Sequence, residues 1–539
     1  MKITTIVRNL IILALLIITP FAAFSQSDSR YDSGLNLPFN QKAGDVNPQT
    51  GNLTLSFTDL ALPGRAGLNF SFSRIWSLNQ SNVFNMNQNS YDGLNYLSSD
   101  TIEQYNHMGV GWSTSLPYIF SPGNAPSEVK NLFFNGGVYE LDTASMPTYS
   151  DYESNIRGYD LLDLRVFTGI TGSAVSYGDC PGGTIPSGYG IDDLTTDNSE
   201  YVLILKDNSK YYFRPDGKIM MQQDRTALNR IWYFYDEYET DNTRLVLVVD
   251  TIERHIQFSY DSNGNLASIE WTVQAGKINT NNSRSYQPIK RSVSYTYADA
   301  ETVYPDIAGL AGSVVNKKTP YALETVTDVQ GNVTKYGYET GLALYSFNSA
   351  VGSSENVYLM LTSVTSMYTA GGFKNKRCFE YGLSNKDKTF YTGFMRYYKI
   401  ARQYDRNRHD EIVGDTTYTY YKPGQGCSYN EYLAVIQTGN ITTTYTYTLS
   451  ELPSRNNVLD AVSTETTDGF LEFTDYTYTN DRTLDLTEVH RNGTWVYSEE
   501  YEYDKKGNPA KQVNRTHSFP DSPCPDFFWA YREERLKIK

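Results

Sequence analysis

The feature that most constrains the fold of this chain is the alternation of apolar and polar residues in short runs. Leu53, Leu55 and Phe57 alternate with polar residues, and Tyr-x-Tyr pairs recur further along. A period of two places such side chains on one face of a β-strand. Turn-forming pairs such as Asp216-Gly217 separate the runs, and glycine there supplies the positive φ of tight hairpins. Helical periodicity is scarce, so the sequence predicts an all-β fold of antiparallel hairpins.

One spacing repeats along this pattern: an aspartate followed by aromatic residues eight and ten positions later. The sets are Asp250 with Phe258 and Tyr260, Asp328 with Tyr336 and Tyr338, Asp410 with Tyr418 and Tyr420, Asp468 with Tyr476 and Tyr478, and, with one extra residue, Asp224 with Tyr233 and Tyr235. Both aromatics of a pair lie on one face of a strand. We expect each aspartate to accept backbone hydrogen bonds at its turn. Each hairpin then buries its aromatic face only by stacking on its neighbours, which predicts an extended sheet.

A second element follows two of the aromatic pairs. It comprises Tyr260-Asp261 with Gly264-Asn265, and Tyr503-Asp504 with Gly507-Asn508; Gly331-Asn332 similarly follows Asp328. These motifs resemble the tyrosine-aspartate (YD) repeats of the RHS family. The segment from Asp45 to Leu60, followed by Leu62-Pro63-Gly64-Arg65, looks like the opening segment of bacterial RHS proteins.

The resemblance implies a long antiparallel sheet that spirals into a hollow shell. In toxin-related members the shell encloses a C-terminal toxic domain, which is released by self-cleavage near a segment rich in Asp, Pro and Gly. This sequence has no Asp-Pro-x-Gly segment. We therefore expect an open or partial spiral without self-cleaving aspartates, and a partner chain that completes the shell is compatible with it. The expected divisions are 1–25, a signal peptide; 26–200, an N-terminal β region; 201–510, the hairpin repeats; and 511–539, a C-terminal tail.

The first residues predict export. Lys2 and Arg8 precede an apolar run, and small residues end it, so we expect a signal peptide cleaved after Ser25. The run is short for a membrane span, and no later run approaches one, which leaves no membrane span after cleavage. The sequence does not choose between periplasm, cell surface and medium. A net charge of −15 argues against nucleic acid as a partner.

Motifs typical of catalytic or metal-binding sites are sparse. The four cysteines, Cys180, Cys378, Cys427 and Cys524, fit no zinc spacing, and no two of the five histidines are close in sequence, so we expect no metal and no cofactor. His409-Asp410 is typical of a solvated hairpin tip. The loop that begins at Asp261 lacks the glycine and glutamate of an EF-hand. No nucleophile elbow, Walker loop or dinucleotide-binding turn occurs, so we expect no catalytic residues.

These observations favour an exported, non-enzymatic β scaffold with a structural or interaction role. One alternative is a carbohydrate-binding or adhesion module with a glycan or protein partner at the cell surface. Its candidate rings are Trp76, Trp112, Trp232, Trp271, Trp495 and Trp529. Trp232 is out of phase with Tyr233 and Tyr235, which predicts that it points to the opposite side of the sheet and is exposed. The other alternative is a glycosidase on a β scaffold.

Overall fold

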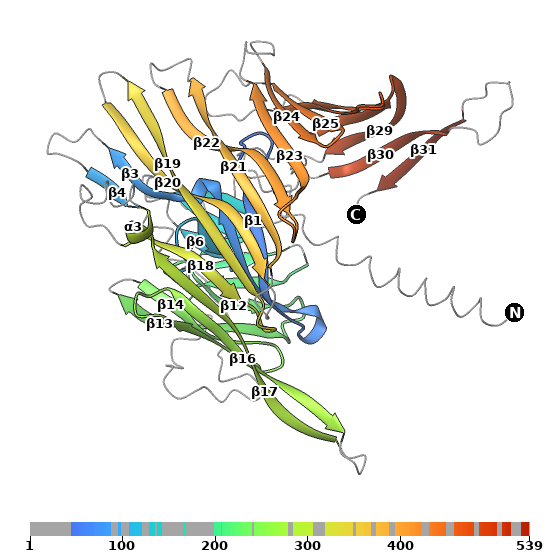
Figure 1. Ribbon diagram of the computed structural model, residues 1–539. Coiled ribbons are helices and arrows are strands. Elements are labelled where there is room, and N and C mark those ends of the chain that lie inside the picture. Colours follow the sequence, from blue (N-terminus) through green and yellow to red (C-terminus); the bar gives the residue numbers. More distant parts are fainter. Residues whose placement is uncertain are drawn as a thin grey trace, which may run out of the picture.

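The computed structural model describes residues 45–87, 95–98, 107–120, 129–134, 137–142, 165–168, 199–205, 207–239, 242–278, 284–304, 319–348, 352–367, 373–387, 394–421, 431–448, 458–478, 484–503, 509–518 and 530–537. Strands dominate these residues, and every strand pair among them is antiparallel (Figure 1). One short helix, α3 (Ala300–Val303), and two 3-10 turns, η2 (Arg65–Gly67) and η3 (Leu78–Gln80), accompany them. The all-β prediction is confirmed.

Most strands form one meander, which we call the wall, in which each strand pairs with the next one along the chain. Its strands are β9 (Arg165–Thr168), β10 (Tyr201–Ile204), β11 (Lys210–Phe213), β12 (Ile219–Gln223), β13 (Arg230–Glu239), β14 (Asn242–Val249), β15 (His255–Tyr260), β16 (Leu266–Ile278), β17 (Arg284–Asp299), β18 (Tyr321–Thr327), β19 (Val333–Asn348), β20 (Gly352–Met367), β21 (Phe373–Asp387), β22 (Phe394–Arg406), β23 (Ile412–Tyr421), β24 (Glu431–Thr438), β25 (Ile441–Thr448), β26 (Val458–Thr466), β27 (Leu471–Tyr478), β28 (Leu484–Arg491), β29 (Thr494–Tyr503), β30 (Pro509–Ser518) and β31 (Ala530–Lys537). The stretch expected as a C-terminal tail thus contributes two of its strands.

The wall remains open. β9 pairs only with β10, and β31 only with β30, among the strands that the structure describes. In the middle, β19 also meets β22 at one position, where Tyr345 lies opposite Met395. Besides β19, β20 has a different partner in each half: its first half pairs with β3 (Asn82–Asn87) and its second half pairs with β21. A hairpin of β3 and β4 (Asn95–Ser98) therefore enters the wall from the N-terminal part of the chain.

The remaining N-terminal strands form two small sheets. β1 (Thr54–Leu62), β2 (Phe70–Ser77) and β5 (Trp112–Thr114) make the first, which we call the N-terminal sheet. β6 (Tyr118–Phe120), β7 (Val129–Phe134) and β8 (Gly137–Asp142) make the second. In Figure 1 the blue β1 lies among the green, yellow and orange strands of the wall.

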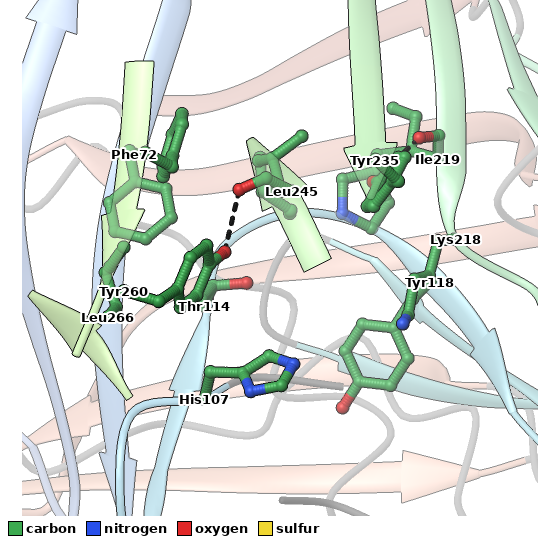
Figure 2. A pocket seen from close by; sticks show the side chains of 13 residues that line it. Phe72, His107, Thr114, Tyr118, Lys218, Ile219, Tyr235, Leu245, Tyr260 and Leu266 are labelled. Carbon is green, nitrogen blue, oxygen red and sulfur yellow. Dashed lines mark hydrogen bonds between the residues drawn. The ribbon is translucent and has the colours of Figure 1, made fainter. Parts of the chain in front are cut away.

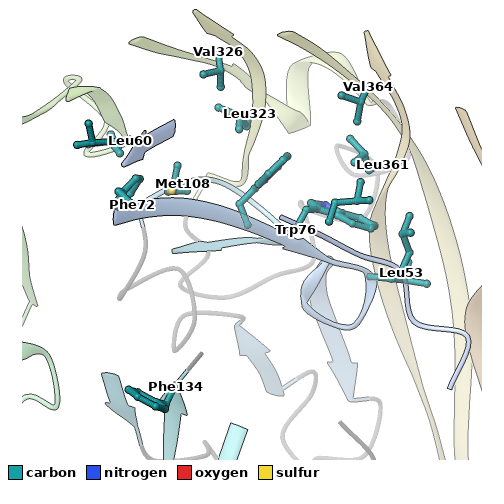
Figure 3. Packing of buried hydrophobic residues seen from close by; sticks show 14 of the residues in the cluster. Leu53, Leu60, Phe72, Trp76, Met108, Phe134, Leu323, Val326, Leu361 and Val364 are labelled. Atoms are coloured by element: carbon teal, nitrogen blue, oxygen red, sulfur yellow. The ribbon is translucent and has the colours of Figure 1, made fainter. Parts of the chain in front are cut away.

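The main core lies between the N-terminal sheet and the inner face of the wall. Phe70 packs on Tyr233 with ring centroids 6.3 Å apart, and Phe72 packs on Phe258 at 5.5 Å. Trp76 is fully buried in the same cluster (Figure 3). Apolar side chains from both layers leave water here, which is the main stabilising contribution to such a packing.

A second core covers the other face of β10–β14. Trp232 belongs to it together with Val202, Phe234 and Leu247, whereas Tyr233 belongs to the main core. Trp232 therefore points away from Tyr233, as the alternation predicts. The expectation that it is exposed is wrong, because only 2% of it is accessible. Its neighbours on that face are also apolar, so both faces of this part of the wall are buried.

Candidate functional site

The repeated aromatics line the inner face of the wall. The first aromatic of each set, Tyr233, Phe258, Tyr336, Tyr418 or Tyr476, is between 2% and 8% exposed and belongs to the main core. The second aromatics, Tyr235, Tyr260, Tyr338, Tyr420 and Tyr478, are half-buried and pack against the same core. The structure thus brings the predicted pairs together on one continuous surface.

A β-bulge lies beside the second aromatic of most pairs, but not beside Tyr420, which lies opposite Ala434 in an unbroken register. Between Phe234 and Tyr235 the partner strand contains one extra residue, so that Tyr235 lies opposite Leu245. Equivalent register shifts stand beside Tyr260, Tyr297, Tyr338, Tyr381, Tyr447, Tyr478 and Tyr503. A bulge locally disrupts the ladder of hydrogen bonds and bends the strand. Repeated at these positions, it accompanies the curvature of the wall.

Tyrosine hydroxyls occupy the gaps that the bulges leave. Tyr260 donates to the carbonyl of Leu245 at 2.7 Å, and Tyr338 donates to that of Leu323 at 2.8 Å. The same bond joins Tyr235 to Ile219, Tyr381 to Leu361 and Tyr478 to Leu459. A buried carbonyl without a partner costs about 1–3 kcal/mol, so each hydroxyl stabilises the bulge on the strand before it. At these five positions the bond explains why the second aromatic is tyrosine.

Four of the predicted aspartates accept backbone hydrogen bonds within their turns. Oδ1 of Asp328 accepts from the N–H groups of Gln330 at 2.8 Å and Asn332 at 2.9 Å, and Gly331 takes a φ of 81°. Asp224, Asp250 and Asp261 make corresponding bonds, and Gly264 and Asn265 complete the turn of Asp261. Both carboxylate oxygens of Asp261 are thereby engaged by the turn itself.

Two turns use a different residue at that position. Oδ1 of Asn407 accepts from the N–H groups of His409 and Glu411, while Asp410 follows with a φ of 63°. Oγ1 of Thr466 accepts from the N–H of Phe470, and it donates to Asp468. Asn and Thr side chains can close such turns as Asp does. Ser25, Asp504, Gly507 and Asn508 lie outside the described residues.

The structure adds three pairs that the aspartate spacing misses. They are Tyr295 with Tyr297, Phe379 with Tyr381, and Tyr445 with Tyr447, all in the main core or packed against it. Tyr-x-Tyr alternation alone predicts two of them, Tyr295 with Tyr297 and Tyr445 with Tyr447. The spacing from an aspartate does not identify these pairs, because the length of the hairpins varies. β16 pairs with β17 as far as Ile278 opposite Arg284, so the turn between them lies far from Tyr295.

A buried ion pair within the N-terminal sheet also makes hydrogen bonds to two tyrosines of the wall, and we call these four residues the Arg74 junction. Arg74 from β2 bonds Asp59 of β1 through Nε at 2.6 Å and Nη2 at 2.8 Å. Its Nη1 donates to the hydroxyl of Tyr336 at 2.8 Å, and Tyr295 donates to Asp59 at 2.8 Å. The guanidinium lies 5.2 Å from the ring centroid of Trp112. Its side chain is 3% exposed.

Electrostatics keep Arg74 charged. Burial alone lowers the pKa of Arg74, but the interactions with Tyr336 and Asp59 outweigh it, so that the pKa is raised overall. Bidentate hydrogen bonds and the surrounding rings replace the water that both charges lose. The junction therefore fixes the orientation of the N-terminal sheet against β17 and β19.

Buried tyrosines predict a loss of stability in alkali. Burial raises the pKa of Tyr211, Tyr418 and Tyr445 from 10.0 to about 12. Folding favours the neutral phenol, so this stabilisation is complete below pH 10 and is lost as the pH rises to about 12. We expect the free energy of unfolding to fall across that window. Phenolate absorbance of the native protein should appear at higher pH than that of the urea-unfolded chain, and coinciding titrations would contradict the burial.

A small cavity lies where the β6 sheet meets β12 (Figure 2). Lys218 and Tyr118 face it from one side, and His107 and Tyr260 from the other. Burial lowers the pKa of Lys218 to about 8. The volume is about 40 Å³, which accommodates water rather than a substrate. The cavity therefore contains a lysine side chain but is too small to hold a substrate beside it.

Two kinds of site were sought in the part of the chain that the structure describes: clusters of metal-binding side chains and helical membrane spans. That part of the chain contains no group of three or more His, Cys, Asp or Glu side chains that could hold a metal ion. It also contains no helix long and apolar enough to cross a membrane. His409 is exposed at a hairpin tip, and Cys378 is a buried free thiol. Cys180, Cys427 and Cys524 lie outside the described residues.

Solved structures that resemble this chain include two at low sequence identity. No family model matches the chain, and no curated protein matches it. A porin-like protein from Bacteroides uniformis is 11% identical, with a TM-score of 0.19 over 57% of this chain and 91% of that one. The structure of TcdB2-TccC3-TEV is 10% identical, with a TM-score of 0.16 over 96% of this chain and 27% of that one. The chain thus spans about a quarter of the latter, and both TM-scores are too low to carry an argument.

Proposed function

We propose that this chain is an exported, non-enzymatic β scaffold of the RHS/YD type, whose curved wall serves as a rigid interaction surface. The observation that carries the proposal is the recurrent unit of aromatic pair, bulge and tyrosine–carbonyl bond. That unit recurs from Tyr235 in β13 to Tyr478 in β27. It stabilises architecture and places no reactive group in a cleft. The YD-like motifs and the predicted signal peptide support the same proposal.

The described tryptophans do not favour adhesion through exposed indole rings. Trp76, Trp112, Trp232 and Trp271 are at most 7% exposed, and Trp495 is half-buried. Trp529 lies outside the described residues. Four of the six rings that could stack on a sugar are therefore committed to packing.

Export is tested by fractionating cells that express the full chain with a C-terminal epitope tag. We expect the mature protein outside the cytoplasm, beginning at Gln26. A variant with Leu15→Arg and Leu16→Arg, which interrupts the apolar run, should keep the intact chain inside. A wild-type chain that stays in the cytoplasm with its first residues in place would contradict the proposal.

The scaffold role is tested on the purified mature chain. Electron microscopy should show an open, curved particle. A panel of chromogenic glycosides should remain intact, because the proposal assigns the wall no catalytic pair of carboxylates. Glycoside hydrolysis that disappears on substitution of a single carboxylate would overturn the non-enzymatic assignment.

A further inference from the structure

The second half of the wall contains a cavity of about 460 Å³ on its inner face. It extends over β22–β25, and we call it the threonine groove after Thr416, Thr438 and Thr443, which line it. Each threonine is two residues from a core side chain, so it shares that residue's face. The volume falls within the range of about 300–1,000 Å³ that small-molecule sites occupy.

The groove has an apolar floor and polar sides. Tyr418, Ile436 and Tyr445 of the main core form its floor. Higher up, Oγ1 of Thr416 and Oγ1 of Thr438 lie 2.9 Å apart across neighbouring strands. An apolar floor suits the C–H face of a sugar ring, while hydroxyls at the sides can donate or accept hydrogen bonds as the ligand requires.

Gln403 adds a side-chain amide to the lining of the groove. Oε1 of Gln403 is buried and accepts no hydrogen bond within the described structure. A buried acceptor without a partner costs about 1–3 kcal/mol, and a ligand hydroxyl removes that cost once the amide rotates towards the cavity.

Charge at the mouth of the groove disfavours ionic ligands. Arg377 bonds Asp405 through Nε at 3.0 Å and Asp45 through Nη1 at 3.3 Å. Two carboxylates around one guanidinium leave a net negative charge, which repels anions, and a cation must compete with Arg377 for both. Hydroxyl groups can bond to the guanidinium and to the carboxylates without disrupting either pair.

From this geometry we infer that the threonine groove binds a short neutral oligosaccharide. The site differs from the exposed tryptophans that the sequence suggests, and it goes beyond the scaffold role. Binding is measured on purified protein, so a failure to bind glycans would leave the proposed export and shape of the chain untouched. A failure of export or of the expected shape would likewise leave the binding result untouched.

The test applies purified mature protein to an array of neutral and anionic oligosaccharides and measures affinity for the best neutral glycan by calorimetry. We expect retention of at least one neutral glycan. Thr416→Val and Gln403→Leu, which remove polar atoms at nearly constant volume, should each weaken binding by about tenfold, equivalent to about 1.4 kcal/mol. Thr417→Val is the matched control, because Thr417 is adjacent, exposed and on the opposite face.

Melting temperature and circular dichroism establish that each variant is folded. Retention of no glycan, or of anionic glycans alone, would overturn the inference. So would equal affinities of the Thr416→Val, Gln403→Leu and Thr417→Val variants.

Discussion

Replacing Arg74 with leucine is expected to lower the free energy of unfolding by about 3–5 kcal/mol, the usual cost of breaking a buried ion pair. Asp59, whose side chain is 5% exposed, would lose its ionic partner and keep only the hydroxyl of Tyr295 as a donor. Tyr336 would also lose its hydrogen bond. Urea unfolding of the mature chain, followed by tryptophan fluorescence, measures the change.

Two further variants show whether the effect belongs to the buried charge. Asp59→Leu combined with Arg74→Leu removes both charges and should cost less than Arg74→Leu alone. Arg402→Leu breaks an exposed pair, in which the side chains of Arg402 and Asp415 are 31% and 41% exposed, and should cost far less than Arg74→Leu. If Arg74→Leu costs no more than Arg402→Leu, the junction does not hold the N-terminal sheet to the wall.

Tyr338→Ser is expected to cost about 3–5 kcal/mol, the scale for losing a large buried aromatic. The hydroxyl of Tyr338 accepts from Trp112 Nε1 at 2.9 Å and donates to the Leu323 carbonyl at 2.8 Å. The substitution therefore removes ring packing and both bonds, one of which reaches the N-terminal sheet. The same urea titration reports the loss.

Tyr338→Phe separates the hydroxyl from the ring. It should cost about 1–3 kcal/mol, because the Leu323 carbonyl and the Trp112 N–H lose their partner. Tyr421→Ser is the control on an exposed tyrosine and should change stability by at most about 0.5 kcal/mol. An effect that small for Tyr338→Ser would show that its ring is not part of the core.

Local signals predicted the strands and many of the turns. Gly264 and Gly331 take the positive φ that their position after an aspartate indicates. Alternation placed Tyr336 and Tyr338 on one face, because that inference needs only the period of a strand. The offset from aspartate was less informative, since Asn407 and Thr466 close their turns in the same way.

Long-range features could not be predicted. Asp59 and Arg74 are 15 positions apart, and Arg74 meets Tyr336 across 262 positions, which no local pattern spans. Trp232 is a second example. Alternation predicts which face of the sheet its side chain lies on, but it does not predict whether other residues cover that face. The apolar run from Ile231 to Tyr235 is a signal of burial on both faces that the alternation argument did not use.

The 262 positions between Arg74 and Tyr336 also determine the order of events during synthesis. At about 5–20 residues per second, a ribosome needs roughly 13–50 s to make that length of chain. β1 and β2 leave the ribosome early, yet the strands that cover them are made much later. Their apolar surfaces are therefore uncovered throughout that delay, so the first strands to be synthesised are among the last to reach their final surroundings.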